Sequence, residues 1–168
     1  LPRETIELAS NVTMSYVQIP AGRFVMGSRD GYPNEHRERA VEVDQPFWIG
    51  AYEVTNAQYQ CFAPSHDSGL ETGEQYAFGA YERGHWLNRA EQPVVRVSQQ
   101  QAIAFCHWLS DQTGRRFSLP TETQWEYACR AGTYTPLSYG DLDADFSERA
   151  NLSDATHYTV DYPHVPTA

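Results

Sequence analysis

The sequence predicts an irregular α+β fold, in which short strands come first and a few helices follow. Two observations lead to this prediction: short alternating runs fill the beginning of the chain, and three polar helix-capping patterns come after them. Stretches without a clear period, rich in Gly, aromatic and charged residues, occupy residues 63–97 and 133–168. Long irregular stretches inside a compact domain usually fold around function, a metal ion or another chain.

The beginning of the chain is expected to form four short strands. Residues 14–26 alternate between apolar and polar side chains and break at residues 20–22, which indicates two strands around a turn. Residues 40–49 indicate two further strands, because Pro46 cannot donate a ladder hydrogen bond and interrupts the run.

Three helices are predicted from their N-terminal capping patterns. In each pattern a Ser or Thr is followed three residues later by Gln, so the two side chains can satisfy groups that the first helical turn leaves unpaired. The three patterns are Thr55–Gln58, Ser98–Gln101 and Thr121–Gln124.

The second and third helices also have apolar faces and Gly stop signals. In the second helix, apolar residues recur with helical spacing and predict one buried face: Ala102, Phe105, Cys106 and Leu109. In the third helix, the expected inner face is Trp125, Ala128 and Cys129. Gly114 and Gly132 are expected to end the two helices, since Gly readily adopts the left-handed conformation of a helix C-terminus.

Composition limits the classes of function. The 168 residues are 40% apolar and 13% aromatic, which fits one folded domain and argues against disorder. The net charge is −10, Lys is absent and the pI is near 4.9, so nucleic acid, whose phosphates need basic patches, is not an expected partner. No membrane partner is expected either, because no run approaches the ~20 apolar residues of a membrane span.

The three cysteines are Cys61, Cys106 and Cys129, so at least one thiol cannot pair within the chain. Cys106 and Cys129 are each expected to be a buried thiol or a member of a disulfide, formed with one another or with a cysteine outside the chain. Cys61 is expected in the core, since no neighbouring basic group would lower its pKa. Disulfides would favour a secreted or periplasmic location, and the start at Leu1 instead of Met would fit a mature or trimmed product.

The last stretch of the chain offers hard oxygen ligands. Residues 141–145 resemble the start of a calcium loop, but the sixth and twelfth positions lack the Gly and Glu of an EF-hand. The run is therefore interpreted as an exposed acidic turn. Asn151, Asp154 and Asp161 still leave calcium binding open on chemical grounds.

An aromatic insert at residues 76–86 has two interpretations. Tyr76, Tyr81 and Trp86 could stack on a sugar or a peptide, because flat side chains with polar tips suit recognition surfaces. The same side chains could instead fill the interior of a long loop.

Five separated blocks of sequence carry a family resemblance. They begin with IPAGRFVMGS (19–28) and an acidic, His-containing loop that ends at residue 36. The others are FWIGAYEVTNAQYQCF (47–62), PVVRVSQQQAIAFCHWLS (93–110) and FSLPTETQWEYACRAGT (117–133), before Ala150-Asn151-Leu152. In order and spacing they closely resemble the formylglycine-generating enzyme (sulfatase-modifying factor) family over residues 17–168. The chain departs from the pattern at Gln99, where the family usually has Trp.

The resemblance implies a fold related to C-type lectins, with a small antiparallel sheet, few helices, and long loops held by calcium. The implied calcium ligands are Asn151, the carbonyl of Leu152, Asp161 and Pro163. It also implies a division of the chain into an N-terminal extension, residues 1–16, and the N-terminal portion of the family domain, residues 17–168. The C-terminal portion of that domain is absent from this chain.

The activity implied by the resemblance is oxidation of a cysteine in a sulfatase peptide to formylglycine, with O2 and copper(I) held by two thiolates. Those two cysteines lie in the family's C-terminal half, so no catalytic residue is assigned here and copper ligands would come from outside this chain. Cys106 and Cys129 match positions that, in some members, form disulfides to that half. The expected partner is therefore a second chain or a C-terminal segment that completes the domain.

Two functions fit the sequence. The chain can be part of a formylglycine-generating-enzyme-like oxidase with a peptide or protein substrate. Alternatively, it can be a non-catalytic, lectin-like module that binds a ligand or a protein. The segment that completes the domain discriminates between them, because an oxidase needs two thiols there and a binding module does not.

Overall fold

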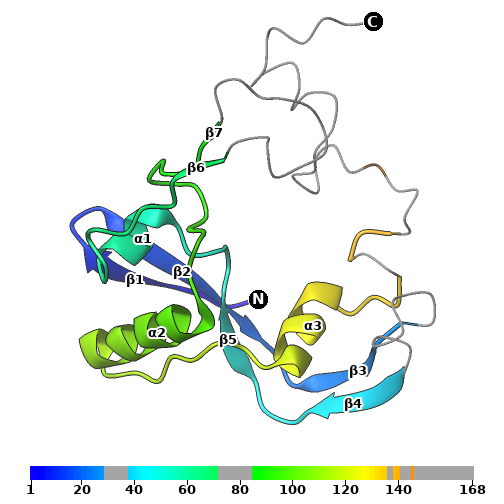
Figure 1. Cartoon of the computed structure of the whole chain (residues 1–168). Helices are drawn as coiled ribbons and strands as arrows, with labels where there is room; N and C mark the ends of the chain where they lie inside the picture. The colour runs from blue at the N-terminus through cyan, green and yellow to red at the C-terminus, as the bar shows by residue number, and fades with distance from the viewer. Residues whose placement is uncertain (29–37, 72–84, 136–137, 141–144, 146–168) are drawn as a thin grey trace, which may run out of the picture. The chain divides into compact units, whose positions relative to one another are not determined.

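The structure is a computed structural model that describes residues 1–28, 38–71, 85–135, 138–140 and 145 (Figure 1). The chain divides into two compact units. The sheet unit comprises residues 1–54 and 97–144, and the loop unit comprises residues 55–96 and 145–168. The mixture of small antiparallel sheets with three helices is the irregular α+β fold that the sequence predicts.

The sheet unit contains two small antiparallel sheets. The first has the order β1-β2-β5, in which β2 (Val12–Ile19) pairs with β1 (Arg3–Ala9) on one side and β5 (Phe47–Gly50) on the other. The second consists of β3 (Gly22–Met26) and β4 (Arg39–Val43). All four predicted strands are therefore confirmed.

Strand β1 is the longest of three strands that sequence reasoning missed in the described residues; the other two are β6 (Leu70–Glu71) and β7 (His85–Trp86). The residues of β1 alternate between exposed and partly buried positions, and charged residues such as Glu4 and Glu7 dilute its apolar character. The strand lies within residues 1–16, which the sequence assigned to an N-terminal extension. The boundary at residue 17 stays a prediction.

The second sheet carries the central apolar cluster of the unit. Phe24, Met26 and Val43 are buried there, with Val41, Phe47 and Tyr127 packed against them. The ring of Tyr127 lies 5.1 Å from that of Phe24, measured between centroids. A Cβ atom at Gly22 would collide with the Tyr127 hydroxyl, so Gly at this position lets the helix approach the strand.

Helix α2 (Gln99–Thr113) follows the sequence prediction closely. Ser98 and Gln101 form the expected capping box, and Gly114 ends the helix in the left-handed conformation with φ of 68°. Phe105, Cys106 and Leu109 are buried, as their helical spacing predicts.

Helix α3 (Glu122–Arg130) begins at the predicted cap, Thr121, but the predicted inner face is wrong. Trp125 is 60% exposed and Cys129 is exposed. The face toward β3 instead carries Tyr127 and Thr123, whose hydroxyl donates to the sulfur of Met26 at 3.7 Å. Sequence reasoning chose the most apolar residues, whereas the helix docks through an aromatic ring and polar groups that find partners.

An ion pair anchors α3 to the end of β3, beside which it lies (Figure 1). Glu126 Oε1 accepts hydrogen bonds from the backbone N–H of Gly27 and from Arg130 Nε, both at 2.8 Å. Arg130 Nη2 donates to the carbonyl oxygen of Gly27 at 2.6 Å. The Arg130 and Glu126 side chains are only 18% and 20% exposed. Both backbone groups of Gly27 are thus satisfied by one helix turn of α3.

The helix also ends one residue earlier than expected. Its last residue is Arg130, and Ala131 already adopts the left-handed conformation with φ of 49°. Gly132, the predicted stop, follows with φ of 84°.

The loop unit contains α1 (Asn56–Gln60) and a short pair of strands, β6 (Leu70–Glu71) and β7 (His85–Trp86). Thr55 caps α1 with the predicted capping box. The fully buried Asn56 donates from Nδ2 to the carbonyl oxygens of Leu87 and Arg89 at 2.7 and 2.9 Å. Ser68, also fully buried, donates to Asn56 Oδ1 at 2.6 Å. This polar network holds irregular backbone in place where an apolar core would otherwise be needed.

The Glu126–Arg130 anchor predicts unequal effects for two arginine substitutions. Arg130→Ala leaves the Gly27 carbonyl and a shielded carboxylate without their donor, and should lower the free energy of unfolding by about 1–3 kcal/mol. Arg23→Ala is the matched control, because the Arg23–Glu42 pair is 76% and 60% exposed and should cost at most about 1 kcal/mol. Chemical denaturation measures both, and equal losses would contradict the anchoring role.

Candidate functional site

Most of the residues proposed from the sequence as ligand sites lie outside the described part of the structure. These are the calcium candidates Asn151, Leu152, Asp161 and Pro163, together with Tyr76 and Tyr81. Trp86 is described and lies in β7 with 62% of its surface exposed. An exposed aromatic ring at this position is available for contact with a ligand, and its binding role stays a prediction.

All three cysteines are free in the structure. Cys106 is buried in α2, and this burial raises the pKa of its thiol. Cys129 is exposed on α3, and Cys61 is partly buried with its Sγ donating to the carbonyl oxygen of Ala57 at 3.4 Å. The disulfide pairings of Cys106 and Cys129 stay predictions.

The buried thiol of Cys106 is poorly suited to hold copper(I). Copper(I) is held by thiolates, whereas the raised pKa of Cys106 keeps that group protonated. Among the described residues, no group of three or more His, Cys, Asp or Glu side chains could hold a metal ion. We therefore derive no step through copper from these residues.

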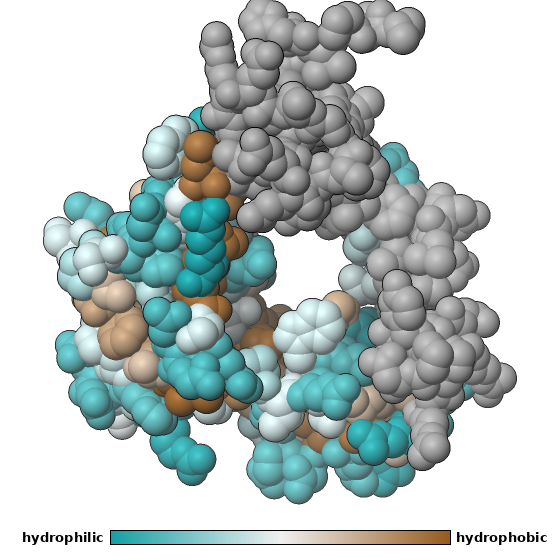
Figure 2. Space-filling model, viewed as in Figure 1, coloured by the Kyte–Doolittle hydropathy of each residue, from teal (hydrophilic) through white to brown (hydrophobic). Residues whose placement is uncertain are grey.

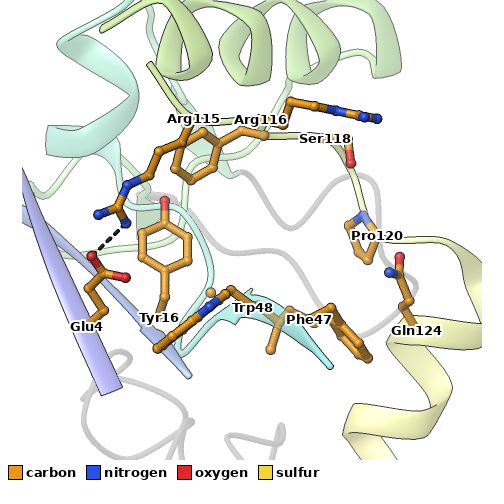
Figure 3. Close-up of a pocket in the computed structure, with 12 residues that line it drawn as sticks. Glu4, Tyr16, Phe47, Trp48, Arg115, Arg116, Ser118, Pro120 and Gln124 are labelled. Atoms are coloured by element: carbon orange, nitrogen blue, oxygen red, sulfur yellow. Dashed lines mark ion pairs between the residues drawn. The ribbon is translucent and has the colours of Figure 1, made fainter. Parts of the chain in front are cut away.

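A pocket of about 650 Å³ lies in the sheet unit (Figure 3). Its walls are β5 on one side and the loop between α2 and α3, residues 114–121, on the other. Tyr16 and Arg115 stand at one end, and Pro120 and Gln124 at the other. The lining consists of Glu4, Tyr16, Phe47, Trp48, Ile49, Gly50, Arg115, Arg116, Phe117, Ser118, Pro120 and Gln124.

Aromatic contacts form the closed end of the pocket. The ring centroids of Tyr16 and Phe117 lie 5.5 Å apart, and the Tyr16 hydroxyl donates to the sulfur of Met14 at 3.5 Å. Burial raises the pKa of Tyr16 to about 12, with a smaller contribution from the nearby Cys106. Tyr16 is therefore a neutral phenol in the wall of the pocket at physiological pH.

The loop wall is held by hydrogen bonds at both ends. The N–H of Phe117 donates to Ser110 Oγ at 2.9 Å, and Ser110 donates in turn to the carbonyl oxygen of Cys106 at 2.8 Å. At the far end, Thr121 caps α3. Arg115 pairs with Glu4 of β1 at 2.6 Å, which ties the loop to the edge of the sheet. The pocket is thus formed by ordered elements.

The chemistry of the pocket suits an amphipathic polypeptide. Phe47, Ile49 and Phe117 supply apolar surface, and Trp48 is 43% exposed at its edge. Arg116 adds an exposed cation. Apolar side chains also reach the visible surface of the described residues in separate patches among hydrophilic ones (Figure 2). None of the helices in the described residues has the length and apolar character to cross a membrane.

Comparison with known proteins places the chain in a family. A profile of the Sulfatase-modifying factor enzyme 1-like domain (FGE-sulfatase) matches residues 3–166. The chain belongs to this family. The profile therefore covers β1 as well as the five sequence blocks, and it confirms the family resemblance seen in the sequence.

Individual relatives of this FGE-sulfatase chain differ in activity. It is 31% identical to the formylglycine-generating enzyme of Bos taurus, covering 72% of this chain and 41% of that protein. It is 31% identical to the formylglycine-generating enzyme of Streptomyces coelicolor, covering 93% of this chain and 59% of that protein. It is also 32% identical to the inactive C-alpha-formylglycine-generating enzyme 2 of Bos taurus, covering 76% of this chain and 52% of that protein.

A solved structure supports the same fold. The structure of PvdO from Pseudomonas aeruginosa superposes with a TM-score of 0.63 at 25% identity, covering 90% of this chain and 58% of that chain. The chain thus spans about half the length of the curated relatives it matches. None of these comparisons transfers an activity to the described residues, because relatives named as active and inactive match equally well.

The raised pKa of Tyr16 predicts a loss of stability at high pH. The folded state holds the phenol proton up to about 12, whereas the unfolded chain releases it near 10.0. Stability from this group is therefore complete below pH 10.0 and is lost as the pH rises toward 12. Denaturant titrations should show a shallower loss over this window in Tyr16→Phe. A loss as steep as that of the unchanged protein would contradict the assignment. The pKa values of Tyr59 and Cys106 are also raised by burial, and both groups contribute to the slope that remains.

Proposed function

We propose that this chain forms the N-terminal part of a formylglycine-generating-enzyme-like oxidase, which converts a cysteine of a protein or peptide to an aldehyde with O2 and a metal. The sulfur leaves as hydrogen sulfide, and an external thiol supplies the two further electrons that reduce O2 to water. The observation that carries the proposal is the alignment with relatives named formylglycine-generating enzyme, 31% identical over 159 residues that make up only 41% of one of them. The catalytic residues lie outside this chain, in a second chain or in a segment that completes the domain.

The chemistry of the described residues supports a binding role for this chain and a catalytic role for the part that completes the domain. The pocket is lined by aromatic, apolar and cationic groups that bind and position but do not oxidise. The buried thiol of Cys106 is held in its protonated form. The chain accordingly supplies scaffold and binding surface, and the metal would be held by thiolates from the completing part.

A non-catalytic, lectin-like binding module is the second candidate. It is favoured by the 32% identity to a relative whose name states that it is inactive, and by the exposed ring of Trp86. In this function the fold and its exposed aromatic rings would bind a ligand or a protein without redox chemistry. The same completing part would then lack the two thiols.

A chimera tests the oxidase. The whole chain is joined to the part of the Streptomyces coelicolor enzyme that it does not match, and the product is incubated with copper, O2, an external thiol and a cysteine peptide from a sulfatase. We expect the mass loss of thiol-to-aldehyde conversion, measured by mass spectrometry. The chain alone and the bacterial part alone are the controls, and both should leave the peptide unchanged. A folded chimera that leaves the peptide unchanged would favour the binding module.

We also propose a structural calcium ion at Asn151, Leu152, Asp161 and Pro163, which offer hard oxygen ligands. Ion binding to the folded state alone should raise the melting temperature with calcium concentration. Asp161→Asn should weaken calcium affinity about tenfold and so reduce this rise. Asp44→Asn, an exposed Asp outside the segment and the matched control, should leave the rise unchanged. Equal responses of the two variants in thermal melts would refute the ligand assignment.

A further inference from the structure

Strand β5 has one paired edge and one open edge. Residues 47–50 pair with residues 16–19 of β2, and β5 is the last strand in the order β1-β2-β5. Within the described residues, no backbone hydrogen bond joins the other edge of β5 to a further strand. An edge of this kind presents a row of N–H and C=O groups that can pair with another strand.

The pocket runs along this strand. All four residues of β5 line it, and the loop between α2 and α3 forms the opposite wall (Figure 3). A concave space between a strand and a facing wall suits an extended chain, because the backbone pairs with the strand while side chains enter the space on alternate sides. The walls offer apolar contacts from Phe47 and Phe117 to such side chains.

A small polar ligand is a poorer fit for this pocket. Small-molecule sites usually fix their ligand with a few buried polar groups. The fully buried polar side chains of the described residues, Asn56 and Ser68, both belong to the loop unit and are bonded to one another. The pocket instead has an exposed aromatic edge, Trp48, and exposed guanidinium groups, Arg115 and Arg116.

The relatives indicate which polypeptide fits. This chain matches 41% of the bovine enzyme and 58% of the PvdO chain, so a large part of each has no counterpart here. The sheet beside the pocket has three strands, and the central apolar cluster has three buried residues. Small sheets and cores of this size gain stability when a further strand covers their open edge.

We propose that an extended strand from the second half of the family domain pairs with the open edge of β5 and fills the pocket. This inference rests on the proposed function, since it takes the chain to be one part of a larger domain. The incoming strand would have apolar residues at alternate positions, whose side chains enter the pocket beside Trp48 and Phe117. Trp48 would lose its exposure to solvent.

Hydrogen exchange tests the pairing in the chimera with the unmatched part of the Streptomyces coelicolor enzyme. In the chain alone, the amides of β5 that point away from β2 should exchange quickly. In the chimera the same amides should exchange at least about tenfold more slowly, because they are now hydrogen-bonded. The amides that already pair with β2 should change little.

Two tryptophan substitutions control for general stabilisation. Trp48→Arg places a charge in the pocket and should remove the protection of the outward amides of β5. Trp125→Arg is the matched control, because Trp125 is exposed at 60% but does not line the pocket, and it should leave the protection intact. Slow exchange at Leu109 in both variants shows that the unit remains folded.

The outcomes separate this inference from the proposed function. Unchanged outward amides in a chimera that still oxidises the peptide would overturn the pairing and leave the oxidase in place. Protected amides in a chimera without activity would support the pairing and count against the oxidase. Protection of the chain alone by the cysteine peptide would overturn the inference as well, because the occupant would then be a substrate. Equal loss from both tryptophan variants would refute the assignment to β5.

Discussion

The contact between Glu126, Arg130 and the backbone of Gly27 determines where α3 lies. One carboxylate and one guanidinium satisfy both backbone groups of a residue at the end of β3, where φ is 94° and the strand stops. This fixes the rotation of the helix and presses Tyr127 onto Phe24. The position of α3 in turn sets Gln124 at the end of the pocket. The polar contact of Glu126 and Arg130 with Gly27 thereby positions both the Tyr127–Phe24 contact of the apolar cluster and one end of the pocket.

Local features of this protein could be predicted from the sequence, and long-range ones could not. The caps at Thr55, Ser98 and Thr121 depend on residues three positions apart, and all three form. The sequence predicts the wrong docking face for α3 because Trp125 is among the most apolar residues of the helix. The face that docks is set by the contact of Glu126 with Gly27, which lies far away in sequence. The pocket went unrecognised for the same reason: its walls come from β5 and from a loop more than sixty residues later, though both fall within blocks that carry the family resemblance.

The interactions that the structure shows in the described residues concern architecture. Capping boxes, the buried Asn56 and the anchor of α3 all stabilise irregular backbone, and none of them performs redox chemistry. A scaffold of this kind can be kept by active and inactive relatives alike.

The shortness of β5 has a consequence for the synthesis of the protein. An N-terminal portion leaves the ribosome first, and an open strand edge is then exposed to other nascent chains. With four residues after Pro46, β5 offers few groups for a wrong partner to pair with. The facing loop, held by Ser110 and Thr121, narrows access further. A short strand edge beside a facing loop thus leaves little room for wrong pairing.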